Sequence, residues 1–90
     1  MKIIFEPLFK IKLLNIIDYI AQDKKSASLK FRNSLQSKIS QLKIYPFMYR
    51  KSIYTNDENI RDLIHDGYTI IYEVKQNTIH ILEIFKWQDK

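Results

Sequence analysis

The hydrophobic period of this chain changes at Pro46, and this change constrains the fold more than any other feature of the sequence. Before Pro46, apolar residues recur at intervals of three and four, the spacing of one buried helix face. After Pro46, apolar and polar residues alternate, as they do in a strand. Proline also forces the preceding Tyr45 into an extended conformation. The sequence therefore predicts helices before this point and a sheet after it.

Two helices are predicted in the first half, after a short strand from Lys2 to Glu6. Pro7 ends that strand and suits the first position of a helix. Two amphipathic stripes then cover residues 8–21 and 26–42. Between them, the polar stretch "AQDKKSAS" contains two candidate N-caps, Asp23 and Ser26. The two helices form a hairpin whose combined apolar face needs another surface to cover.

Four strands are predicted in the second half, because four segments are rich in Ile, Tyr, Thr and Val. They are 49–55, 59–65, 68–74 and 78–85. Asp66-Gly67 is the strongest turn signal, since both positions tolerate positive φ. The predicted fold class is α+β, in the order β-α-α-β-β-β-β, with the helical hairpin packed on one face of an antiparallel meander sheet.

Length and composition indicate one folded domain over residues 1–90. A chain of 90 residues has too little apolar surface for two cores, and 46% apolar residues argue against disorder. No cysteine is present, so disulfides and thiolate zinc sites are excluded and the chain fits a cytoplasmic location. Charged residues and Pro7 interrupt the apolar start, and we expect neither a signal peptide nor a membrane partner.

The last two strands carry apolar residues on both faces. Strict alternation places Ile79 and Ile81 on one face, and Leu82 and Ile84 on the other with His80. Two helices cover only one face, so the pattern predicts a partner surface on the second face, with a homodimer as the alternative. The net charge of +5 favours an acidic protein or a nucleic acid as that partner.

The order and spacing of several motifs resemble the RelE/ParE superfamily of toxins from type II toxin-antitoxin modules. The similarity runs through "FRNSLQSKISQLKIYPFMYR", "IRDLIHDGYTIIYEV" and "IHILEIF". The positions that match the family pattern are Leu42, Tyr45, Pro46, Arg61, Leu63, Tyr68, Ile70 and Tyr72. Together these segments cover nearly the whole chain.

This resemblance implies a growth-arresting toxin that a cognate antitoxin neutralises in a toxin-antitoxin hetero-oligomer. It leaves three alternatives for the activity. A ParE-like member inhibits DNA gyrase without cutting nucleic acid. A RelE-like member cuts mRNA in the ribosome without a metal ion. A degenerate relative retains only antitoxin binding.

The residues that distinguish these alternatives lie on the third strand and at the end of the chain. For a nuclease, the resemblance implies Arg61 and Lys86 as catalytic residues. However, Phe85 stands where many members carry a histidine, and Trp87 stands where they carry a second arginine. The set is incomplete, so we expect the ParE-like activity, with no cofactor and no metal.

Six residues are candidates for binding the target or a nucleic acid. They are Arg50, Lys51, Arg61, His65, Lys86 and Trp87. Neighbouring strand residues face opposite ways, so Arg50 and Lys51 cannot both belong to one patch. His65 shares a face with Arg61, with polar cover of a hairpin end as its alternative role. Trp87 is either part of the core or a binding anchor.

Overall fold

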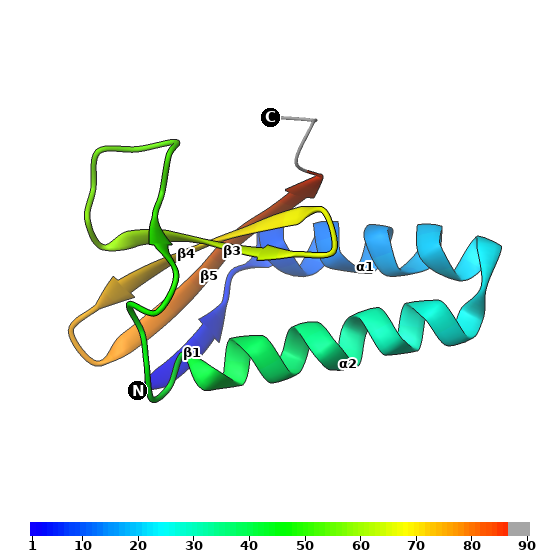
Figure 1. Ribbon diagram of the computed structural model, residues 1–90, viewed down its shortest axis with the longest axis horizontal. Helices are drawn as coiled ribbons and strands as arrows, with labels where there is room; N and C mark the ends of the chain where they lie inside the picture. The colour runs from blue at the N-terminus through cyan, green and yellow to red at the C-terminus, as the bar shows by residue number, and fades with distance from the viewer. Residues whose placement is uncertain (87–90) are drawn as a thin grey trace.

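The computed structural model describes residues 1–86 and contains two helices and five strands in the predicted order (Figure 1). Strand β1 (Lys2–Phe5) is followed by helices α1 (Pro7–Asp23) and α2 (Lys25–Gln41). Strands β2 (Arg50–Lys51), β3 (Ile60–His65), β4 (Tyr68–Lys75) and β5 (Thr78–Lys86) complete the described chain. The predicted α+β class is confirmed.

The five strands form one mixed sheet in the order β1-β5-β4-β3-β2. Strands β2 to β5 are an antiparallel meander, as predicted, but β1 pairs with β5 in parallel. The predicted antiparallel meander is therefore confirmed for β2 to β5, and β1 adds a parallel edge strand to it. A parallel neighbour needs a long connection, which the helical hairpin and the meander supply between β1 and β5.

Both helices pack on the same side of the sheet and bury one core (Figure 1). The core side chains come from every element except β1 and β2, and they include Phe9, Phe31, Leu35, Ile70 and Tyr72. Pro7 opens α1, as the sequence predicts.

A single residue, Lys24, separates the two helices, and the candidate N-caps Asp23 and Ser26 are both wrong. Asp23 is the last residue of α1 and Ser26 lies inside α2. The N–H of Lys24 donates to the carbonyl of Ile20, and its own carbonyl accepts from the N–H of Ala27 at 3.1 Å. The backbone therefore makes the reversal without a capping side chain.

Strand β2 is much shorter than the predicted 49–55. The N–H of Ser52 still donates to the carbonyl of Ile60 on β3 at 2.8 Å, but after Ser52 the backbone bonds to side-chain oxygens instead of a neighbouring strand. The N–H of Ile53 donates to Oδ2 of Asp62 at 3.1 Å, and the N–H of Tyr54 donates to Oγ of Ser52 at 3.2 Å. Such local bonds compete with a sheet ladder, so the chain leaves the sheet and forms the loop at one end of the molecule (Figure 1).

A β-bulge at Leu82 changes which residues of β5 face the core. Ile71 pairs with Glu83 while Tyr72 pairs with Ile81, so Leu82 is the extra residue. Ile84 consequently joins Ile81 in the core, and both are 0% exposed. The prediction that Ile81 and Ile84 lie on opposite faces of the sheet was wrong. Side chains alternate between the two faces only where no bulge interrupts the strand pairing.

The second face of the sheet is partly covered by the chain itself. Ile71 and Phe85 are only 8% exposed, and the ring of Tyr54 meets Phe85 edge-on at 5.4 Å. At these positions, the prediction of an open apolar sheet face was wrong, because the loop after β2 folds over it. Neither helix within residues 1–86 is long and apolar enough to cross a membrane.

Candidate partner-binding surfaces

Arg61, the residue that the family resemblance singles out, holds the loop between α2 and β3. Its Nε donates to the carbonyl of Glu58 at 2.9 Å, and its Nη1 donates to the carbonyl of Tyr49 at 3.2 Å. The guanidinium also lies 4.8 Å from the centre of the Phe47 ring, a cation–π contact. Arg61 is therefore built into the fold at this end of the sheet.

Arg50 and Lys51 lie opposite different residues of β3 and do not form one patch. Lys51 pairs with Arg61, whereas Arg50 pairs with Asp62. The Nη2 atom of Arg50 is 3.4 Å from Oδ2 of Asp62, a carboxylate that is fully buried on its side-chain atoms. Arg50 thus neutralises a buried acid.

His65 is buried between the β3–β4 turn and α2, with 3% of its surface exposed. Its Nε2 lies 3.2 Å from Oγ of Ser34, and its ring packs 5.1 Å from the ring of Phe31. Burial lowers the pKa of His65, with Lys38 acting in the same direction and Asp66 opposing it. The structure thus places this candidate binding residue in the packing of α2 against the sheet.

Lys86 lies at the far end of the sheet from Arg61. Arg61 pairs with Tyr72 and Lys86 with Tyr68, positions four residues apart on β4. At about 3.4 Å per residue, they are separated by roughly 14 Å along the strand alone. The structure does not bring the two candidate catalytic cations together, and Trp87 lies outside the described residues.

Tyr72 is the tyrosine nearest to Arg61 in the register, and it is held neutral. Its hydroxyl donates to the carbonyl of Pro46 at 2.8 Å. Burial is the main cause that raises its pKa to about 12. A phenol with this pKa stays protonated at neutral pH and does not act as a general base. Within residues 1–86, no three His, Asp or Glu side chains are grouped to hold a metal ion.

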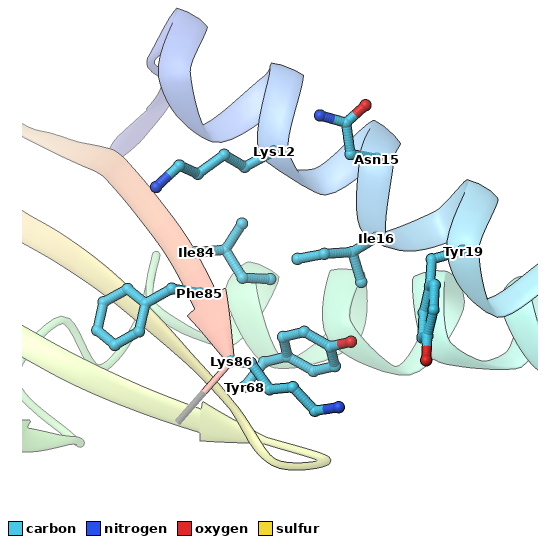
Figure 2. Close-up of a pocket in the computed structure, with 8 residues that line it drawn as sticks. All are labelled: Lys12, Asn15, Ile16, Tyr19, Tyr68, Ile84, Phe85 and Lys86. Atoms are coloured by element: carbon cyan, nitrogen blue, oxygen red, sulfur yellow. The ribbon is translucent and has the colours of Figure 1, made fainter. Parts of the chain in front are cut away.

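A hollow lies between α1 and the end of β5, with a volume of about 490 Å³ (Figure 2). Lys12, Asn15, Ile16 and Tyr19 approach it from α1. On the sheet side it is lined by Tyr68 from β4 and by Ile84, Phe85 and Lys86 from β5. We call this hollow the strand-end pocket.

A second hollow of about 270 Å³ lies between the two helices. Its floor is apolar, with Phe9, Leu13 and Leu35 among its residues, and Lys10 and Arg32 stand at its edge. We call it the interhelix groove. A groove with an apolar floor and basic residues beside it suits an acidic amphipathic segment of another protein.

The outer surface of α1 joins these two hollows and is unusually apolar. Leu8, Ile11 and Leu14 are 49%, 59% and 61% exposed. They recur every three residues, on a different face from the buried Phe9. We call these three residues the outer ridge. Isolated exposed leucines are ordinary, but a continuous row beside two hollows indicates a binding surface.

Comparison with known proteins identifies the family. A family model described as the ParE toxin of the type II toxin-antitoxin system parDE matches residues 3–89. The chain belongs to the ParE toxin family. It is accordingly a toxin of a type II toxin-antitoxin module, and its partner is a cognate antitoxin. The predicted resemblance to the RelE/ParE superfamily is confirmed, and the matching family within it is that of the ParE toxins.

A solved structure shows the same fold. The "Chromosomal ParDE TA system from P. aeruginosa" contains a chain that superposes with a TM-score of 0.77 at 20% identity. The match covers 96% of this chain and 95% of that one. None of the curated proteins matches the sequence.

The sequence contained a signal for the outer ridge that the helix prediction did not use. Residues 8–21 are apolar around most of the helix, whereas one buried stripe needs only Phe9, Leu13, Ile16 and Ile20. The additional apolar residues at positions 8, 11 and 14 indicate a second apolar surface on this helix. The sequence contained no signal for either hollow, because each hollow combines residues that are far apart along the chain.

Proposed function

We propose that this ParE-family toxin acts in the cytoplasm, where it arrests growth by inhibiting DNA gyrase and does not cut nucleic acid. The placement of Arg61 supports this proposal best. Its guanidinium is committed to the carbonyls of Tyr49 and Glu58, and it lies at the other end of the sheet from Lys86.

Metal-independent RNA cleavage needs a base, an acid and cations around one phosphate. The histidines of the described chain are engaged away from Arg61. His65 contacts Ser34 on α2, and Nδ1 of His80 lies 2.9 Å from Oε1 of Glu6. Tyr72 is neutral at physiological pH because its pKa is about 12. This arrangement favours a toxin that acts by binding.

The second candidate function is a ribosome-dependent endoribonuclease that uses Arg61 and Lys86. One observation favours it: Lys86 is exposed and makes no ion pair with any residue of 1–86, so its ammonium group is available to a phosphate.

The deciding experiment combines a gyrase supercoiling assay on the purified toxin with transcript-end mapping after its expression in bacteria. We expect supercoiling to be inhibited and transcript ends to stay unchanged. Ribosome-dependent cuts that disappear in Lys86→Ala would establish the endoribonuclease instead. Normal growth together with tight antitoxin binding would identify a degenerate relative that only binds its antitoxin.

The antitoxin is proposed to bind through an acidic amphipathic segment in the interhelix groove. Arg32→Glu should weaken this binding, because it places an acidic group beside the acidic segment. Lys75→Glu is the matched control, because this substitution makes the same change in net charge. Lys75 is the last residue of β4, beside the turn to β5. Equal affinities of the two variants, measured by calorimetry, would refute this placement.

A further inference from the structure

The strand-end pocket contains a polar group that the fold positions but does not use. Tyr68 is 9% exposed, and its ring packs edge-on against Phe31 at 5.4 Å. Its hydroxyl makes no hydrogen bond within residues 1–86 and points into the hollow, toward Tyr19 (Figure 2). The hydroxyl is therefore available to donate a hydrogen bond to a ligand in the hollow.

The charges around the pocket define what that ligand is. Lys86 lies beside Tyr68 and has no ion-pair partner among the described residues. Lys12 also lines the pocket, and its ammonium group pairs with Glu83, which lies outside the lining. Among residues 1–86, no acidic side chain lines the hollow. The ammonium group of Lys86 and the hydroxyl of Tyr68 can both donate hydrogen bonds to one carboxylate. A carboxylate is therefore the group that suits this site.

The walls define the rest of the ligand. Ile16 from α1 and Ile84 from β5 face each other across the pocket (Figure 2). A volume of about 490 Å³ is far larger than a lone carboxylate needs. The pocket therefore has room for an acidic side chain together with a neighbouring apolar side chain from the same peptide.

The outer ridge indicates where that peptide comes from. Leu8, Ile11 and Leu14 run along α1 between the strand-end pocket and the interhelix groove, so one chain can follow apolar surface from one hollow to the other. Because the antitoxin is the acidic partner proposed for the groove, the same polypeptide is the occupant most consistent with this continuity.

We propose that the antitoxin crosses α1 and places an acidic side chain, with an adjacent apolar one, in the strand-end pocket against Lys86 and the hydroxyl of Tyr68. The toxin is then held on both sides of α1. This inference rests on the proposed antitoxin site in the interhelix groove and adds a second, separate anchor.

The test is the affinity of the intact toxin for its purified cognate antitoxin, measured by calorimetry. Lys86→Glu should raise Kd by roughly 10- to 100-fold, and Tyr68→Phe should raise it by about tenfold, as expected for hydrogen bonds to a charged group. Tyr68→Phe keeps the ring that packs on Phe31, so the variant should fold as wild type. Tyr45→Phe and Lys75→Glu are the matched controls, since Tyr45 is 63% exposed on the loop after α2.

Replacement of each antitoxin Asp or Glu by Lys should reveal one variant that restores binding to Lys86→Glu toxin. Wild-type affinity of both Lys86→Glu and Tyr68→Phe, with Arg32→Glu still weakened, would overturn the second anchor and leave the groove intact. No binding by wild-type toxin would overturn both the groove and the second anchor that rests on it. A toxin dimer in light scattering that Ile11→Gln dissociates would assign the outer ridge to a second copy and also overturn the proposal.

Discussion

Asp62 is the buried acid that fixes the loop after β2 to the sheet. It is 1% exposed, and its Oδ2 accepts from the N–H of Ile53 at 3.1 Å and from Arg50 at 3.4 Å. Asp62→Ala leaves the N–H of Ile53 without its acceptor. We expect the free energy of unfolding to fall by about 1 to 3 kcal/mol. Urea denaturation measures this.

The control for Asp62→Ala is Glu58→Ala in the same loop. The side chain of Glu58 is exposed, so we expect its loss to change stability by less than about 0.5 kcal/mol. If both variants were equally stable, the carboxylate of Asp62 would not be what holds the loop.

His65 should make the stability of the toxin depend on pH. Burial lowers its pKa in the folded state below the ordinary value of 6.5, so the unfolded chain binds the proton more readily. The stabilisation is complete well above pH 6.5 and is lost as the pH falls through the folded pKa. Thermal unfolding from pH 8 to pH 5, at intervals of about half a unit, follows this loss.

One variant separates the effect of His65 from general acid destabilisation. His65→Gln should flatten the decline in unfolding temperature below pH 6.5. An identical decline in the wild-type and variant proteins would show that the carboxylates cause it.

At the scale of the element, the bulge in β5 is the feature with the largest consequence. It places Ile84 in the core with Ile81, and it leaves Leu82 only half-buried. Ile84→Ala should therefore cost about as much stability as Ile81→Ala, about 2 to 5 kcal/mol. Leu82→Ala should cost clearly less. Chemical denaturation of the three variants tests the register, because strict alternation would place Ile84 with Leu82 on the other face and predicts different costs for Ile84→Ala and Ile81→Ala.

At the scale of the whole molecule, a substitution in the outer ridge should weaken antitoxin binding without lowering the stability of the fold. Ile11 is 59% exposed, so Ile11→Gln should change the unfolding temperature little. It should nevertheless weaken antitoxin binding, because an apolar contact is lost at the centre of the proposed interface. Co-expression with the antitoxin should then fail to restore growth fully. Full rescue of growth at wild-type antitoxin levels would exclude the ridge from the interface.

Local patterns in the sequence by themselves determined the helices, the change to strands at Pro46, and the β3–β4 turn. Pro7 opens α1, and Asp66 and Gly67 adopt φ values of 50° and 84°, as their turn requires. These features follow from residues close together in the chain, where backbone preferences and hydrophobic period act directly. The family motifs have the same local character.

Only the tertiary structure decided the parallel pairing of β1, the bulge at Leu82, the short β2 and the strand-end pocket. Each depends on residues that meet from distant parts of the chain. The carboxylate of Asp62 draws Ile53 out of the sheet, and Tyr68 meets Lys86 only because β4 and β5 pair. Alternation along one strand carries no information about such partners, since it records which residues are apolar and not what they pack against.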